Sequence, residues 1–406
     1  MTVCSTETAG PAFTIAADGS YAARLAGEGE ARFPERWTLD GPEPYAVPLP
    51  LEQPEEADSE VLPLTDGRVL IHRRVADRHA FALLYPTGSG GSAGPRTGEL
   101  ALGVIEAREE QRVTLLPPAP DGRSAYALVA GGGTSTVWRV AGGASAPERV
   151  AELAGSCSGG VWLDRAGRML ALDRETGGRV KAVSVDLGRA GEVSPLLQIA
   201  ERSDDRLLLA DPDSGLLLIR SDAPGEPRLG WGVLGSARPV RFPECLRAAG
   251  GSAVPFAVQP GQALMPESCA VALRLGGGTG TPGDTGAAGG SAGGTAAGGD
   301  AGTAGGTGAA GDVRLGLWRP SEKRLFELRG PVGWLGGAGL WTRDGLLRLP
   351  YATGDEPCGV LTATMPQPAP QIRVMPTSVP AQPSPLPAPP AAPRPVPLQQ
   401  APLTGR

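Results

Sequence analysis

A short turn followed by an apolar strand recurs along this chain, and this recurrence constrains the fold more than any other feature. Asp121 and Gly122 precede the run Ser-Ala-Tyr-Ala-Leu-Val, Asp164 precedes Met-Leu-Ala-Leu, and Asp205 precedes Leu-Leu-Leu-Ala. A spacing of roughly 40 residues is the sequence period of a β-propeller blade. Short strands between Gly, Asp and Pro clusters, without a helical apolar period, indicate an all-β fold.

The spacing of the turns also predicts the number of blades. Further turns of the same kind lie at Asp18, Asp66 and Asp344. At roughly 43 residues per blade, the chain outside its low-complexity segments has room for seven blades, with six or eight as alternatives. A closed ring of blades protects the edges of many short strands.

Two low-complexity segments interrupt this pattern. Residues 276–311 consist almost entirely of Gly, Ala, Thr, Ser and Asp, and residues 366–406 are rich in Pro. Such segments bury little apolar surface, so we expect a disordered loop and a disordered tail that are dispensable for folding. The propeller then covers 1–365, interrupted by the loop. The tail favours polyproline II, and its interaction candidates are Pro380, Pro383, Pro390 and Pro393.

Charge and cysteine content limit the partners and the location. The 406 residues carry a formal net charge of −6 and five cysteines without a Cys-x-x-Cys pair. An acidic chain has no electrostatic footprint for nucleic acid or for an anionic membrane. The start lacks the features of a secretory signal, and no apolar run is long enough for a membrane helix. The sequence predicts a cytoplasmic monomer that binds an unknown protein partner or a small ligand.

One hairpin carries a resemblance to known proteins. The segment from Asp173 to Gly177 reads Asp-x-x-Thr-Gly, and Asp211 to Gly215 follows this pattern more loosely. It resembles the turn of bacterial β-propellers of the TolB-like, quinoprotein-like and surface-layer-like groups. The resemblance implies a propeller fold. The Trp-docking residue of the quinoprotein-like group is not found after either turn, so we expect no quinone and no other cofactor.

One cysteine motif is similar to that of a catalytic nucleophile. Gly155-Ser-Cys157-Ser-Gly159 matches a nucleophile elbow with Cys in place of Ser. The elbow needs a strand-to-helix turn and, in that fold, a histidine later in the chain. Both histidines, His72 and His79, come earlier, and no helical pattern follows Gly159. We therefore expect a turn between strands and no catalytic residue.

Metal sites and acid-base pairs are not favoured either. His72 and His79 flank Asp77, but Asp77 and Arg78 are typical of a hairpin tip, so we expect a solvated turn there. Asp211-Pro-Asp213 begins like a calcium loop, yet Leu216 occupies the position where such a loop needs Gly. A hairpin turn is the preferred interpretation, and no metal is expected.

Seven tryptophans are many for a chain with six Phe and five Tyr. Most are expected to fill the space between blades. Trp334 and Trp341, which stand among Gly-rich loops, are candidate ligand contacts at the mouth of the channel. Because a propeller fold leaves the chemistry open, the sequence favours a non-catalytic binding or scaffold protein. The alternative is a lactonase-like or lyase-like enzyme with a site at the channel mouth.

Overall fold

The computed structural model describes residues 13–88, 96–143, 147–247, 253–261, 264–276, 313–335 and 337–366. The chain divides into two units, Met1–Met365 and Pro366–Arg406, and the structure described below is that of the first. Apart from Gly276, the predicted Gly-rich loop lies outside the described residues, and so does the predicted tail apart from Pro366. Their disorder stays a prediction.

Strands form almost all of the regular structure. The helices among the described residues are three short 3-10 helices, η1 (Leu187–Arg189), η2 (Glu244–Leu246) and η3 (Pro266–Ser268). The strands follow one another in seven antiparallel groups of three or four. The predicted all-β propeller fold is confirmed.

The first three groups contain four strands each. They are β1 (Thr14–Ile15), β2 (Tyr21–Ala26), β3 (Phe33–Thr38) and β4 (Tyr45–Pro48); β5 (Glu60–Pro63), β6 (Val69–Val75), β7 (Arg78–Thr87) and β8 (Arg96–Glu106); and β9 (Arg112–Leu115), β10 (Ala125–Gly131), β11 (Thr134–Ala141) and β12 (Glu148–Ala154).

The fourth and fifth groups are β13 (Ser156–Trp162), β14 (Met169–Thr176), β15 (Arg179–Asp186) and β16 (Glu192–Pro195); and β17 (Asp205–Ala210), β18 (Leu216–Ser221) and β19 (Arg228–Val233). The last two are β20 (Ala253–Val258), β21 (Val271–Leu275), β22 (Arg314–Trp318) and β23 (Phe326–Arg329); and β24 (Leu340–Trp341), β25 (Leu346–Tyr351) and β26 (Gly359–Thr364).

One parallel contact complicates the count of blades. Lys181 of β15 pairs with Asp205 of β17, and this joins the fourth and fifth groups into one seven-stranded sheet. By strand pairing the described residues therefore form six sheets, although seven antiparallel groups are present. The predicted number of seven blades stays a prediction.

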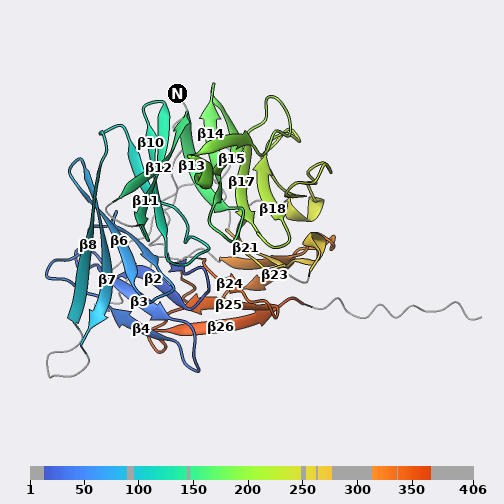
Figure 1. Ribbon diagram of the computed structural model, residues 1–406. Coiled ribbons are helices and arrows are strands. Elements are labelled where there is room, and N and C mark those ends of the chain that lie inside the picture. Colours follow the sequence, from blue (N-terminus) through green and yellow to red (C-terminus); the bar gives the residue numbers. More distant parts are fainter. Residues whose placement is uncertain are drawn as a thin grey trace, which may run out of the picture. The chain divides into compact units, whose positions relative to one another are not determined.

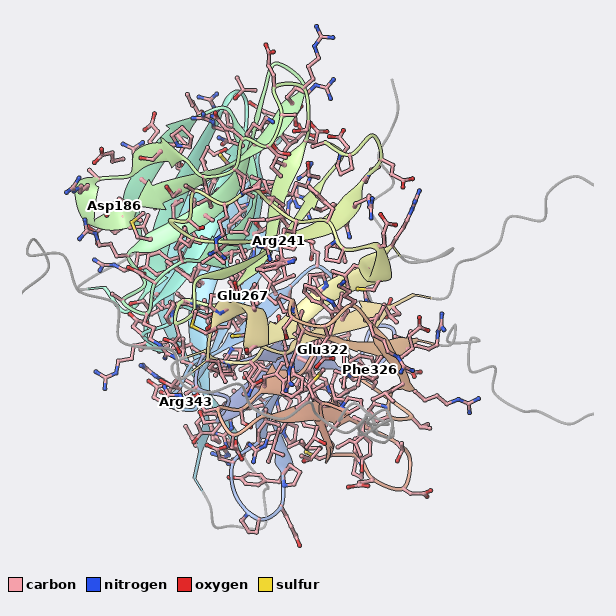
Figure 2. All side chains as sticks on the ribbon, turned by 90° about the vertical axis from the view of Figure 1, so that its right-hand side faces the viewer. Asp186, Arg241, Glu267, Glu322, Phe326 and Arg343 are labelled. Atoms are coloured by element: carbon pink, nitrogen blue, oxygen red, sulfur yellow. The ribbon has the colours of Figure 1, made fainter. Side chains whose placement is uncertain are left out.

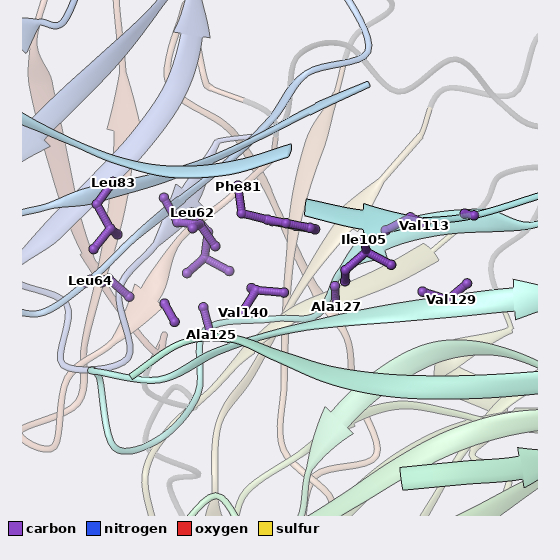
Figure 3. Packing of buried hydrophobic residues seen from close by; sticks show 13 residues of the cluster. Leu62, Leu64, Phe81, Leu83, Ile105, Val113, Ala125, Ala127, Val129 and Val140 are labelled. Carbon is purple, nitrogen blue, oxygen red and sulfur yellow. The ribbon is translucent and has the colours of Figure 1, made fainter. Parts of the chain in front are cut away.

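Apolar runs lie in the second strands because both faces of each group are covered. In β6, Val69 and Ile71 belong to the cluster shared with the first group, whereas Leu70 belongs to the cluster shared with the third. Side chains of a strand alternate between its two faces, so a continuous apolar run suits a sheet that is buried on both sides. Figure 3 shows one such cluster, in which Leu62 and Phe81 approach Ala125 and Val140.

The same kind of packing links the last group to the first. Trp37 of β3, which is fully buried, packs with Phe13, and Leu335 and Val360 from the C-terminal part of this unit lie against this cluster. In Figure 1 the blue strand β4 accordingly lies beside the red strand β26. Hydrophobic packing therefore continues from each group to the next until the first group is reached again.

Aspartates hold the turns between the first and second strands. Asp18, Asp66 and Asp121 each accept a hydrogen bond from the backbone N–H two residues later. This geometry is an Asx turn, and a following Gly supplies the positive φ. Gly122, with φ 69°, also packs tightly on the neighbouring group, because a Cβ there would lie 2.3 Å from the Thr65 side chain.

The sequence assignment of the fifth turn was wrong. Asp205 is the first residue of β17 rather than part of a turn, and the equivalent turn lies between β17 and β18, where Asp211 accepts hydrogen bonds from Ser214. Asp211 to Gly215 thus joins the first and second strands, whereas the related motif from Asp173 to Gly177 joins the second and third. The aspartates of the two motifs also act differently, because Asp211 caps its own turn whereas Asp173 accepts a hydrogen bond from Leu207 of the next group.

Candidate functional site

A cavity of about 1580 Å³ lies among the strand groups of this unit. All seven strand groups contribute to its wall, mainly through their first strands. One lining residue from each group is Thr14, Glu60, Thr114, Trp162, Leu209, Val258 and Leu340. The cavity is therefore a consequence of the arrangement of the groups around a common centre, and its wall carries both apolar and charged side chains.

One end of the second group brings polar side chains into this wall. In an antiparallel meander the start of the first strand and the hairpin between the second and third strands lie at the same end. Here Glu60 begins β5 and pairs in register with His72 of β6, close to the hairpin at Ala76. Arg74 and His79 pair across the same hairpin. All four of Glu60, His72, Arg74 and His79 line the cavity.

Glu60, His72 and His79 form a chain of hydrogen bonds. His72 Nδ1 lies 2.9 Å from Glu60 Oε2, and His72 Nε2 lies 2.8 Å from His79 Nδ1. The same Glu60 oxygen accepts a hydrogen bond of 2.9 Å from the backbone N–H of Leu115, in the third group. Both histidines are buried, and Phe81 stacks on the His72 ring. The three side chains are thus held in one orientation.

The environment favours a neutral His79. Burial lowers the pKa of His79 below its usual value, and the nearby His72 and Arg74 act in the same direction. Asp58 and Glu60 oppose this shift without cancelling it. A neutral imidazole at pH 7 keeps one nitrogen lone pair, so this group can accept a hydrogen bond or a proton.

The prediction of a solvated turn was wrong for the histidines. Asp77 and Arg78 do form the exposed hairpin tip, but His72 and His79 are buried, and the acidic partner is Glu60 rather than Asp77. The register explains the error. His72 stands opposite Phe81 and Arg74 opposite His79, so the two histidines are diagonal neighbours on one sheet face. A tight hairpin over residues 75–78 would have predicted that the two histidines are neighbours. The contact with Glu60 was not predictable in this way, because it depends on the pairing of β5 with β6.

The two predicted tryptophan contacts lie apart from the cavity wall. Trp341 is buried in the cluster between the sixth and seventh groups. Trp334 is half-buried, its Nε1 donates a hydrogen bond of 2.7 Å to the Ala338 carbonyl, and its ring meets Phe256 edge-on. The segment between them, Gly337 to Leu340, does line the cavity. These positions do not support a ligand contact at either tryptophan, and the predicted contacts stay a prediction.

The remaining predicted interaction residues, Pro380, Pro383, Pro390 and Pro393, lie outside the described residues. Their binding of a partner stays a prediction.

Cys157 lies in strand β13 and not in a turn, so that part of the sequence interpretation was wrong. Gly155 alone separates β12 from β13, and the strand runs without a helix into the next turn. The Cys157 side chain is buried, its backbone N–H donates to Ser135 Oγ, and burial raises the pKa of its thiol. A thiol in these surroundings has no feature of an activated nucleophile.

The described residues show neither a metal-binding cluster nor a membrane-spanning helix. They contain no group of three His, Cys, Asp or Glu side chains arranged to hold a metal ion. Asp211, the start of the calcium-like motif, accepts hydrogen bonds from Ser214 and from the Gly261 backbone and serves as a turn. In the described ranges there is also no helix with the length and apolar character needed to cross a membrane.

A second, very small hollow lies beside β19. Trp231, Arg241 and Glu267 line it, and its volume is about 20 Å³. Figure 2 shows Arg241 and Glu267 on adjacent segments, and the Arg241 guanidinium lies 5.0 Å from the centre of the Trp231 ring. This space is close to the size of one water molecule, so it is a packing defect around a cation–π contact.

Comparison with known proteins finds only remote likeness. No family model and no curated protein matches the sequence. Prolyl oligopeptidase B from Galerina marginata has a similar structure at 10% identity and a TM-score of 0.48, with 86% of this chain and 45% of that chain covered. This chain thus spans about half the length of that protein.

Two bacterial structures are similar over most of their length. A putative TolB from Agrobacterium tumefaciens is 12% identical, with a TM-score of 0.37 and coverage of 88% of this chain and 90% of that one. An oligogalacturonate lyase from Vibrio parahaemolyticus is 11% identical, with a TM-score of 0.47 and coverage of 87% and 89%. The weak resemblance to TolB-like propellers expected from the hairpin motif is confirmed at this level, and it carries no function.

Proposed function

We propose that this protein is a non-catalytic β-propeller that binds a small polar ligand in its central cavity. The observation that carries the proposal is the cavity itself, which exceeds the roughly 300–1,000 Å³ of a typical ligand pocket. Its wall combines apolar side chains, such as Leu209 and Phe256, with charged ones, such as Arg74 and Arg112. Apolar contact supplies affinity in such pockets and a few polar groups supply orientation.

The role as a scaffold for a protein partner belongs to the same proposal, as do the cytoplasmic location and the monomeric state. The enzymatic alternative, a lactonase-like or lyase-like activity, depends on one observation, the hydrogen-bonded pair of His72 and His79 in the cavity wall. A hydrogen-bonded pair is equally suited to ligand recognition. Binding is therefore the simpler function for this site.

The test is ligand-dependent thermal stability of the full chain. Monosaccharides, disaccharides, dipeptides and small organic acids are added one at a time, and the melting temperature is measured. A ligand that binds the folded state at a concentration 100 times its Kd stabilises it by about 2.7 kcal/mol. We expect at least one of these compounds to raise the melting temperature by a few degrees.

Two tryptophan variants make the test specific for the cavity. Thr114→Trp places a large ring on a half-buried cavity-lining residue of β9, whereas Thr362→Trp places the same ring on an exposed residue of β26 that is not part of the lining. The stabilisation should be lost in T114W and kept in T362W. If no compound stabilises the wild type, or if both variants respond alike, the proposal is wrong.

A further inference from the structure

When both imidazoles are neutral, the hydrogen-bond chain at the second group sets where the protons lie. An ionised carboxylate has no proton to donate, so His72 Nδ1–H is the donor in its hydrogen bond with Glu60. In a neutral His72, Nε2 is then an acceptor, and His79 Nδ1–H donates a hydrogen bond to it. His79 Nε2 is left with a lone pair. The order of the three side chains thus turns the last nitrogen into a hydrogen-bond acceptor.

That nitrogen has no hydrogen-bond partner among the described residues, although His79 lines the cavity. A cation stands beside it. Arg74 is the cross-strand neighbour of His79 and also lines the cavity. Within the described part of the chain, its only hydrogen bond is a long one of 3.4 Å from Nε to the Ala76 carbonyl, and it forms no ion pair. The terminal nitrogens of Arg74 are therefore free to bind.

We propose that His79 Nε2 and the Arg74 guanidinium form a recognition site for a hydroxy carboxylate. The guanidinium binds the carboxylate of the ligand through two parallel N–H donors, and His79 Nε2 accepts a hydrogen bond from a ligand hydroxyl. Glu60 and His72 are positioning residues, because they fix the tautomer of His79 and do not touch the ligand. This proposal rests on the proposed function, since it names the ligand class of the same cavity.

Acidic side chains near the site define the main competing outcome. Asp58, Glu109 and Glu110 line the cavity as well, together with the basic Arg32 and Arg112. Glu60 is occupied by His72 and Leu115, which leaves the charges of both signs nearly balanced. If the acidic side chains dominated, the cavity would prefer a cationic ligand. The probes are chosen to separate these cases.

Four probes with six-carbon chains test the two contacts separately. Gluconate has a carboxylate and hydroxyls, hexanoate only the carboxylate, and sorbitol only hydroxyls; glucosamine has hydroxyls and an ammonium group and lacks a carboxylate. Calorimetric titration of the full chain should give gluconate a Kd at least about tenfold lower than that of each of the others, because each comparison removes one hydrogen-bonded or charged contact. Equal affinities, or a preference for glucosamine, would overturn the proposal.

Single substitutions then assign the contacts to residues. Arg74→Gln should weaken gluconate and hexanoate alike, and His79→Gln should reduce the preference for gluconate over hexanoate. Arg78→Gln is the matched control, because Arg78 is an exposed arginine on the same hairpin that does not line the cavity. It should bind like the wild type. Arg74 is exposed, so its substitution leaves folding intact and the result interpretable.

Nitrogen NMR of the imidazoles supplies a readout that a purely structural role would not change. The chain has two histidines, so the spectrum contains two rings. Gluconate should shift the Nε2 resonance of His79 much more than that of His72, and no shift at His79 would contradict the assignment. If other compounds stabilise the cavity but gluconate does not bind, the hydroxy-carboxylate site is wrong and the binding function stands. If nothing binds, both are wrong.

Discussion

Two buried polar networks bridge adjacent strand groups, and they differ in how they end. Around Asp205, which is fully buried, the network is closed: the carboxylate accepts hydrogen bonds from Lys181 Nζ at 2.7 Å, Ser203 Oγ at 2.8 Å and Ser221 Oγ at 2.6 Å, and from the Ile199 backbone at 2.9 Å. The Glu60, His72 and His79 network is open, because its last nitrogen faces the cavity without a partner among the described residues.

The difference separates a structural network from the network that we propose binds a ligand. Burial alone would raise the pKa of Asp205, but the hydrogen bonds from Lys181 and Ser221 outweigh it and the pKa is lowered. The surrounding donors all form hydrogen bonds with this carboxylate, so the carboxylate is not available to bind a ligand. In the open network the pKa of His79 is lowered mainly by burial, and an acceptor is left over. A complete buried polar network makes the fold rigid, whereas an unused acceptor in a cavity wall can accept a hydrogen bond from a ligand.

The largest expected effect comes from breaking the closed network. Asp205→Asn leaves the half-buried Lys181 ammonium without its counter-charge. Removing one partner of a buried pair costs up to about 3–5 kcal/mol. Urea unfolding at pH 7 measures this loss. Glu201→Gln, which removes an exposed carboxylate from the preceding turn, should change the free energy of unfolding little. A loss below about 1 kcal/mol in D205N would mean that the network is not structural.

A smaller effect is expected at Asp173, another buried carboxylate between the fourth and fifth groups. Burial raises the pKa of Asp173 to about 6, although the Leu207 N–H and Arg206 favour its charged form. The folded state therefore keeps a proton that the unfolded state releases near pH 3.8, so the stability from this group falls as pH rises from about 4 to about 6. Asn cannot titrate.

The wild type should therefore lose stability relative to Asp173→Asn over this range, by on the order of 2 kcal/mol. Urea unfolding of both proteins at several pH values from 4 to 7 measures the difference. A difference that stays constant or rises with pH would show that the carboxylate is already ionised at low pH. Such a result would mean that Asp173, like Asp205, is ionised in a network whose hydrogen bonds are complete.

The smallest effect on stability is expected at the open end. The pKa of His79 is below its usual value, so the unfolded state binds a proton at a higher pH than the folded state does. The stability from this group is present above about pH 6.5 and is lost as pH falls from there through the folded pKa. Compared with His79→Gln, the wild type should lose some stability on acidification, and less than the change at Asp173. If His79→Gln lowered the free energy of unfolding at pH 7 as much as D205N does, the result would contradict an open network.

The fold was predictable because its signals are local. Asp-Gly turns, as at Asp66 and Asp121, and apolar runs such as that around Leu70 each reflect a few neighbouring residues. The misplaced fifth turn has the same origin, since Asp205 has the local appearance of a turn residue. Its role depends on Lys181 and Ser221, which only the folded chain brings to it.

The candidate site was not predictable in the same way. His72 and His79 are related by a hairpin, but Glu60 and Leu115 reach them through pairings between strands and between groups. The tryptophan candidates failed to gain support for a related reason: a ring beside Gly-rich segments is equally suited to the interior, where Trp341 lies. Whether a polar side chain lies in a turn, a core or a cavity wall is decided by contacts distant in sequence.

The cluster that joins the last group to the first has a consequence for biosynthesis. Phe13 and Trp37 are made early, while Leu335 and Val360, which cover their cluster, are made near the end of this unit. During translation every other interface forms soon after its two groups emerge, but this one waits for almost the whole unit. The nascent chain therefore carries an uncovered aromatic surface for most of its synthesis. Apolar surface that stays exposed during such an interval is prone to premature association.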